Sequence, residues 1–224
     1  MRVIILSDTH LMHSQVKVPD GDLLIHCGDY TNKGSNSDTL DFLNWFSAHN
    51  HSYKVWINGN HELGHDKGPM RQSKIDLYKS FTDKNKNLFY LEHSSIMIDG
   101  FKIFGSPFTP FFYNWAYNVA RGAEIASKWA DIPDDTNILV THGPVYGILD
   151  LVKDNFHNSG RDLHQGCEEL LKRVNQLKQL KLHAGGHLHL QGGQTKVVNG
   201  ITFVNAAICT EDYQPTNLPV VIDL

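Results

Sequence analysis

The chain has 224 residues, a net charge of −4 at pH 7 and 41% hydrophobic residues. This charge argues against extended nucleic-acid binding, which needs a basic face, and no apolar run approaches the roughly 20 residues of a membrane helix. Three cysteines, without a close pair, argue against a disulfide framework or a zinc ribbon. We therefore expect one globular domain over residues 1–224. Residues 1–8 lack a secretory h-region, which favours the cytoplasm.

Short apolar runs in the first half of the chain predict buried strands. The first three cover residues 2–6, 23–27 and 53–57, and each run gives way to small and polar residues. Between and after them, apolar residues at helical spacing predict helices over 37–48 and 70–81.

Later segments contain more strands and two further helices. We predict helices over 119–129 and 165–177. The expected strands cover residues 88–91, 95–98, 102–104, 137–140, 180–184, 195–198, 201–204 and 219–223. Asn199-Gly200 is a strong hairpin signal between two of these strands. Early alternation of strands with helices and later hairpins predict a mixed α/β fold, with two packed sheets forming a β-sandwich flanked by helices.

Five polar motifs each follow a predicted strand. They are Asp8-Thr9-His10, Gly28-Asp29, Gly59-Asn60-His61, His142-Gly143 and Gly186-His187-Leu188-His189. Each one alone has a plainer interpretation as a helix cap, a turn or a hydrogen-bonded core histidine. Because the ends of neighbouring strands in an open sheet meet at one edge, the motifs can converge on a single point.

Together, these motifs offer the ligands of a dinuclear metal centre. Mixed nitrogen and oxygen ligands without a thiolate suit Mn, Fe, Zn, Co or Ni, and the set is too large for one ion. Two divalent ions bring four positive charges and two carboxylates return two negative ones, so a net charge of about +2 attracts a phosphate and can hold a hydroxide. Two ions ~3.5–4 Å apart also stabilise the attacking and leaving oxygens of an in-line displacement.

The series of motifs resembles the calcineurin-like metallophosphoesterase superfamily. Within this superfamily, the chain resembles the metallophosphoesterase-domain (MPPED) subfamily over nearly its whole length. Five segments carry this resemblance: residues 59–62 (GNHE), 100–110 (GFKIFGSPFTP), 141–144 (THGP), 181–183 (KLH) and 214–217 (QPTN). The resemblance implies a four-layer αββα fold. It also implies hydrolysis of phosphate esters by a metal-bound hydroxide, with Mn favoured as the metal. The expected substrate is a small phosphodiester, such as a cyclic nucleotide.

The resemblance also assigns roles to the site residues. One metal would be bound by Asp8, His10 and His189, and the other by Asn60, His142 and His187. Asp29 would bridge the two metals, and His61 would be an acid near the leaving oxygen that does not bind metal. Some members of the subfamily lack the first histidine of the G-H-x-H motif, whereas this chain has both. If residues 187–189 are extended, both imidazoles lie on one face and Leu188 points to the core.

Several alternatives stay open. The aromatic segment 108–117 is interpreted as packing, at a core edge or a homodimer contact, ahead of a platform for a nucleobase. A phosphomonoesterase or a protein phosphatase would use almost the same site, and a non-catalytic scaffold ranks lower because every ligand is present. Six other histidines lie in polar segments and are expected to be solvated, namely His13, His49, His51, His65, His157 and His164.

Overall fold

The computed structural model describes residues 1–153 and 162–224, so His157 lies outside the described residues. Five strands form a first sheet in the order β15-β1-β2-β3-β4. Their bounds are β1 Arg2–Leu6, β2 Leu23–His26, β3 Tyr53–Trp56, β4 Leu88–Tyr90 and β15 Val220–Asp223. Strands β1 to β4 are mutually parallel, and β15 pairs antiparallel with β1.

Six strands form a second sheet in the order β13-β14-β12-β9-β6-β5. Their bounds are β5 Ser94–Ile98, β6 Phe101–Ser106, β9 Ile138–Thr141, β12 Leu182–Gly185, β13 Gln194–Val198 and β14 Ile201–Asn205. The four central strands are parallel, and both edge strands are antiparallel to their neighbours. The turn at Asn199-Gly200 joins β13 to β14, and both residues have positive φ, as the predicted hairpin requires.

The two sheets face each other across a shared core. Val3 and Ile5 of β1 point into this core with residues of β9, β12 and β14. Because side chains alternate along a strand, Ile4 and Leu6 point outward and pack under the first pair of helices. These helices are α1 Asn36–Ser47 and α2 Arg71–Thr82.

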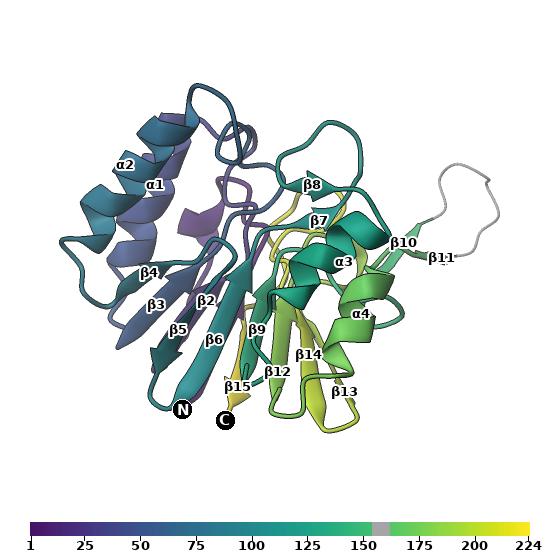
Figure 1. Cartoon of the computed structure of the whole chain (residues 1–224). Coiled ribbons are helices and arrows are strands. Elements are labelled where there is room, and N and C mark those ends of the chain that lie inside the picture. Colours follow the sequence, from purple (N-terminus) through teal and green to yellow (C-terminus); the bar gives the residue numbers. More distant parts are fainter. Residues whose placement is uncertain (154–161) are drawn as a thin grey trace.

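The outer face of the second sheet is covered by α3 Ala123–Ala130 and α4 Glu168–Val174. Figure 1 shows one helical pair on each side of the stacked sheets. The mixed α/β sandwich with four αββα layers that the sequence predicts is therefore confirmed. None of the helices in the described part of the chain is both long and apolar enough to cross a membrane.

Short elements complete the fold and differ from the sequence-based expectation. They are the strand pairs β7 Thr109–Pro110 with β8 Asn118–Val119 and β10 Leu151–Lys153 with β11 Asp162–His164, and the 3-10 turns η1 His13–Gln15 and η2 His189–Gln191. Val119 lies in β8 and not in the helix predicted from residue 119, because the chain turns at Gly122, where φ is +82°, before α3 begins.

The carboxyl ends of the central strands meet at one end of the sandwich. An isolated bridge between Ser7 and Ala207 connects the chain after β1 to the chain after β14. Ser7 N donates to Ala206 O at 2.9 Å and Ser7 O accepts from Ile208 N at 2.9 Å. These bonds join the two sheets where the motifs emerge, while both termini lie at the opposite end (Figure 1).

Candidate metal centre

Four of the expected ligands occupy an unusual backbone conformation. Asp8, His10, Asp29 and His187 have φ of 53°, 42°, 56° and 69°, in the left-handed region that side chains other than glycine rarely adopt. Such residues cluster at functional sites, where the surrounding structure offsets a cost of ~1–3 kcal/mol each. The strand-to-loop turns therefore aim these side chains at a common point.

Glycines let the backbones of these turns approach the ligands. A Cβ on Gly186 would lie 2.0 Å from Asp8 Oδ2, and one on Gly59 would lie 2.3 Å from Asp29 Oδ1. Both distances are far below a van der Waals contact. Only glycine therefore fits at these two positions with the carboxylates in place.

Asp8, His10 and His189 form a first group, whose potential ligand atoms all lie within 4.8 Å of one another. His189 donates from Nδ1 to Thr210 O at 2.9 Å, and its Nε2 lies 3.3 Å from Asp8 Oδ1. The ring nitrogens of His10 are buried and have no hydrogen-bond partner among the described residues. Buried polar atoms without a partner are rare, so the His10 imidazole has the character of a ligand.

Asp29, His142 and His187 form a second such group. His142 donates from Nδ1 to Cys27 O at 2.8 Å. Its Nε2 lies 3.1 Å from Asp29 Oδ2 and 3.0 Å from Asn60 Oδ1. All the residues that the sequence analysis names as ligands are thus brought together at the convergent strand ends.

A third group, His10, Asp29 and His61, connects the other two. His61 donates from Nδ1 to Asn32 O at 2.9 Å, and its Nε2 lies 4.0 Å from Asp29 Oδ2. The indole of Trp115 stacks on the His61 ring at 4.2 Å. His61 therefore adjoins the centre next to Asp29 but belongs to neither of the first two ligand groups.

The metal-free site holds its carboxylates charged and His187 neutral. Burial raises the pKa of Asp29, but the charges of His142 and His61 outweigh it and hold this pKa well below its usual range. Burial also raises the pKa of Asp8, but the hydrogen bond from His189 and the charge of His142 outweigh it and hold this pKa below its usual range. Burial lowers the pKa of His187 to about 3. Burial lowers the pKa of His142, but the charge of Asp29 outweighs it and raises this pKa to about 10. Deprotonated carboxylates and neutral histidines are the forms that bind metal.

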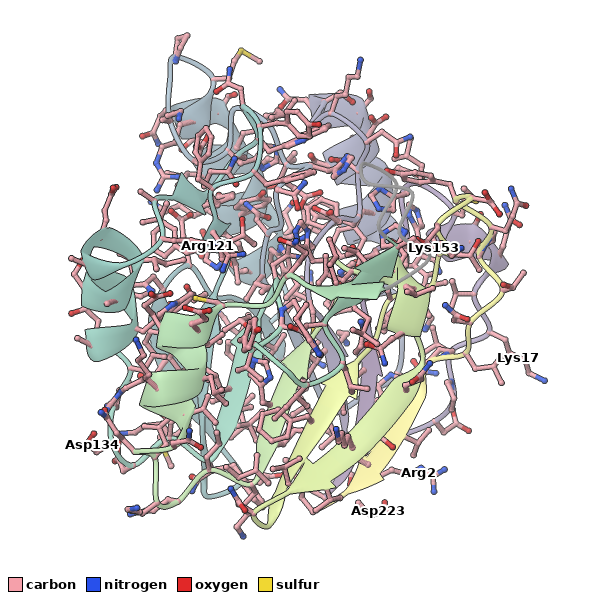
Figure 2. All side chains as sticks on the ribbon, turned by 90° about the vertical axis from the view of Figure 1, so that its right-hand side faces the viewer. Arg2, Lys17, Arg121, Asp134, Lys153 and Asp223 are labelled. Atoms are coloured by element: carbon pink, nitrogen blue, oxygen red, sulfur yellow. The ribbon has the colours of Figure 1, made fainter. Side chains whose placement is uncertain are left out.

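A cavity of about 620 Å³ opens above these groups. Asp29, Asn60, His61, His187 and His189 are among the residues that line it. Arg121 and Lys153 belong to its walls, and Figure 2 shows them at the same level, far from Arg2 and Asp223 at the other end of the strands. Leu188 also lines the cavity, so the expectation that it points to the core is wrong. The left-handed φ of His187 and the 3-10 turn from His189 prevent an extended segment.

A model of the calcineurin-like phosphoesterase family matches residues 1–191 of the chain. The chain belongs to the calcineurin-like phosphoesterase family. It is also 38% identical over 237 residues to metallophosphoesterase domain-containing protein 1 of Homo sapiens, covering 100% of this chain and 71% of that protein. It is 35% identical to UPF0046 protein K07C11.7 of Caenorhabditis elegans, covering 99% of this chain and 74% of that protein.

Comparison with solved structures bears on the fold alone. The protein TT1561 of Thermus thermophilus superposes with a TM-score of 0.57 at 10% sequence identity, covering 91% of this chain and 88% of that one. At such low identity the match says nothing about substrate. The family resemblance predicted from the motifs is confirmed by the family match and by the full-length relatives.

The donor set of this phosphoesterase fits divalent metal ions. His142 and His189 each donate one ring N–H to a backbone carbonyl, the arrangement that orients a metal-binding imidazole. The other ring nitrogen of each, Nε2, then faces a carboxylate. The His10 ring, which has no hydrogen-bond partner in the described part of the chain, belongs to two of the ligand groups. Nitrogen and oxygen donors without a thiolate suit Mn, Fe, Zn, Co or Ni.

Glu62 supports the centre and receives no role from the sequence analysis. It is fully buried, and its carboxylate accepts from Asp29 N at 3.0 Å and from Gly59 N at 2.6 Å. It also accepts from Thr31 N and Oγ1, both at 3.0 Å. One side chain therefore joins the turns that carry Asp29 and Asn60. Its position directly after the Gly59-Asn60-His61 motif was the only signal in the sequence.

Three of the six histidines expected to be solvated are buried instead. His13 lies 3.1 Å from Asp41 and packs against Phe42 and Trp45. His51 lies 3.1 Å from Pro19 O, and His65 lies 3.2 Å from Gly34 O. Partners distant in the sequence make this burial favourable, and a local pattern does not reveal them.

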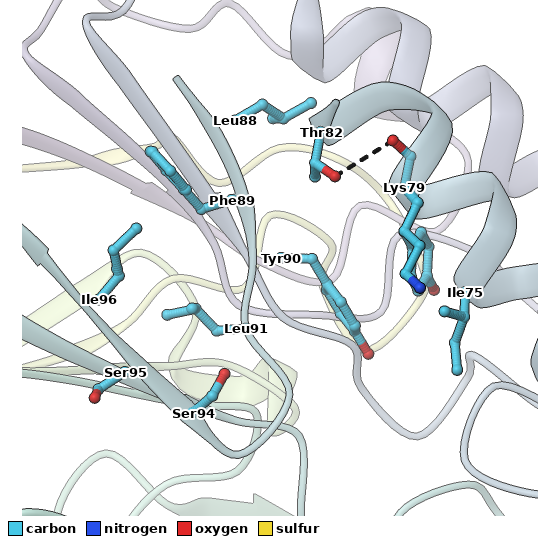
Figure 3. A pocket seen from close by; sticks show the side chains of 11 residues that line it. Ile75, Lys79, Thr82, Leu88, Phe89, Tyr90, Leu91, Ser94, Ser95 and Ile96 are labelled. Carbon is cyan, nitrogen blue, oxygen red and sulfur yellow. Dashed lines mark hydrogen bonds between the residues drawn. The ribbon is translucent and has the colours of Figure 1, made fainter. Parts of the chain in front are cut away.

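A second cavity, of about 410 Å³, lies between α2 and the edge strands β4 and β5. Figure 3 shows Ile75 and Lys79 of α2 facing Phe89, Leu91 and Ile96 across it. None of the candidate ligands lines this cavity, and its lining is mainly apolar. We therefore place the chemistry in the first cavity.

Proposed function

We propose that this chain is a phosphodiesterase that uses two divalent ions, with Mn favoured. Asp8, His10 and His189 would hold one ion, and Asn60, His142 and His187 the other. Asp29 would bind both. The proposal rests on the three adjoining ligand groups. The group of His10, Asp29 and His61 shares His10 with the first group and Asp29 with the second.

The bound ions would supply positive charge and an activated nucleophile for displacement at phosphorus. Glu62 would keep the metal ligands in place, because it fixes the backbone of both Asp29 and Gly59. Asp29 accepts a hydrogen bond from His61 N at 2.8 Å. The positions of the bridging carboxylate and of the acid would therefore be fixed relative to each other.

His61 would give a proton to the leaving oxygen. Its Nδ1–H is used by Asn32 O, so Nε2 is the atom available at the cavity. The stacked Trp115 restricts rotation of the ring. A positioned acid of this kind typically contributes ~10²–10⁴ in rate.

The substrate would be a small phosphodiester, such as a nucleotide. A cavity of about 620 Å³ with Phe111, Phe112 and Trp115 on its wall suits one compact organic group beside the phosphate.

The whole of residues 1–224 would form one domain, because β15 pairs with β1 and so joins the last strand to the first.

A comparison of substrates on the same metal-loaded protein tests this function. We expect rates with bis(4-nitrophenyl) phosphate to exceed those with 4-nitrophenyl phosphate, and chelator to abolish both. A higher rate with the monoester would assign the chain to the phosphomonoesterases instead. If the protein bound two metal ions per chain but hydrolysed neither ester, the alternative of a non-catalytic scaffold would be favoured.

A further inference from the structure

Three consecutive aromatic residues are exposed beside the candidate metal centre. Phe111, Phe112 and Tyr113 are 64%, 53% and 62% exposed. Phe111 and Phe112 line the cavity above the metal centre, whereas Tyr113 is not among its lining residues. Exposed apolar side chains in such a group mark a place where a ligand or a partner binds.

The backbone that presents these rings is firmly held. Asn118 Nδ2 donates to Phe112 O at 2.9 Å and to Tyr113 O at 3.0 Å. Phe111 N donates to Val119 O at 2.8 Å, next to the β7–β8 pairing. The backbone that presents the rings is therefore preorganised, which reduces the entropy lost when a ligand binds.

The aromatic surface continues from the cavity mouth to the reacting centre. Trp115 lines the same cavity and stacks on His61 at 4.2 Å with 29° between the rings. The aromatic wall, defined here as Phe111, Phe112 and Trp115, thus lies on the side of the centre where His61 lies. The expectation of packing at a core edge is met by Ala116 and Tyr117, which are buried, whereas a homodimer contact of the exposed rings stays a prediction.

Away from the aromatic wall, the cavity is lined by two cations beside apolar residues such as Val152, Leu163 and Leu190. Arg121 donates to Gln165 O at 2.8 Å and to Gly166 O at 2.9 Å, and Lys153 pairs with Glu211. Both cations line the cavity, and cationic side chains attract anionic phosphoryl groups. The two ends of a phosphodiester would therefore meet different surroundings.

We propose that the aromatic wall is the leaving-group subsite, and that it binds the planar aromatic ring of the alcohol released next to His61. This inference rests on the proposed function, in which His61 faces the leaving oxygen. A planar ring stacks on aromatic side chains through its π face. Diesters whose leaving alcohol carries an aryl group or a nucleobase would be the preferred class, and the retained substituent would matter less.

Two substrates with one leaving group test the assignment. Methyl 4-nitrophenyl phosphate and benzyl 4-nitrophenyl phosphate both release 4-nitrophenol, but they retain different substituents. Phe111→Ala and Phe112→Ala should each lower kcat/KM about tenfold, and by the same factor on both substrates, mainly through KM. Tyr113→Ala is the matched control, because it removes an equally exposed ring of the same segment that does not line the cavity, and it should leave both rates unchanged.

A larger loss on the benzyl ester would place the wall at the retained substituent and overturn the proposal. Equal rates for Phe111→Ala, Phe112→Ala and wild type would overturn it too. A second measurement does not depend on turnover. The binding of 4-nitrophenol to the metal-free protein is measured by the quenching of tryptophan fluorescence. The two phenylalanine variants should bind about tenfold more weakly than wild type and Tyr113→Ala. If the two phenylalanine variants bound 4-nitrophenol as tightly as wild type, the assignment of the subsite would be wrong. If binding followed the expected pattern but no substrate were turned over, only the proposed function would be contradicted.

Discussion

Replacing Gly59 with alanine should disturb the metal centre without removing a ligand. A Cβ at this position would lie 2.3 Å from Asp29 Oδ1, 2.6 Å from His142 Cε1 and 2.7 Å from His142 Nδ1. The φ of Gly59 is not positive, so the backbone accepts alanine and the clash with the two side chains is the whole effect.

The magnitude follows from the distances. Restoring an ordinary contact of ~3.4 Å would move the Asp29 carboxylate by about 1 Å, and a misplacement of that size costs about 10² in rate. Overpacking of a dense site also costs ~1–3 kcal/mol of stability. For a domain of this size, this lowers Tm by about 2–12 °C.

Gly143→Ala provides the matched control, because Gly143 also adjoins His142. A Cβ there would meet only Thr109 Cγ2 at 3.4 Å and His187 Cδ2 at 3.9 Å, which are ordinary contacts. We expect near wild-type metal content, Tm and turnover of bis(4-nitrophenyl) phosphate for this variant, and losses in at least turnover and Tm for Gly59→Ala. If the two variants behaved alike, the close approach of Gly59 to the ligands would not be the reason for glycine there.

Three further perturbations address single side chains. Asp29→Ala should lose both metals and nearly all turnover, since one carboxylate belongs to two ligand groups; metal analysis showing two ions per chain would contradict this. His61→Ala should keep both metals and lose ~10²–10⁴ in kcat, with a larger loss on alkyl than on aryl esters, and an equal loss on both would argue against the acid role. In the metal-free protein, burial lowers the pKa of His142 but Asp29 raises it more, to about 10 from 6.5. Protonated His142 therefore stabilises the fold below about pH 6.5, and this contribution should disappear as pH rises towards 10. Urea unfolding of chelated wild type and His142→Gln should then converge at alkaline pH, and a constant difference would refute the assignment.

Elements with a strong hydrophobic pattern could be predicted from the sequence. The apolar run at residues 2–6 coincides with β1, and the helical spacing at residues 70–81 lies within one residue of α2. Asn199-Gly200 also predicted its hairpin, because few other residues accept positive φ in succession. These features depend on local sequence alone.

Elements held by distant contacts were missed. The pair β7–β8 has two residues per strand and includes Pro110, and the pair β10–β11 has three. Such short segments carry no measurable period. Their position depends on contacts such as that of Arg121 with the carbonyls of Gln165 and Gly166.

The candidate site was predicted by its motifs, but the surroundings of its ligands were not. Nothing in the motifs around Asp29 and Asn60 indicates that Glu62 joins their two turns. Nor does the aromatic composition of residues 108–117 show which rings face the cavity. The side of the segment that faces solvent is set by Asn118 and by strand pairing, which sequence spacing does not encode.

The most direct test of the dinuclear centre is anomalous diffraction from crystals of the Mn-reconstituted protein. The account predicts two Mn peaks ~3.5–4 Å apart, with Asp29 bound to both. Asp8, His10 and His189 should surround one peak, and Asn60, His142 and His187 the other. A single peak under saturating Mn, or two peaks without Asp29 between them, would contradict it.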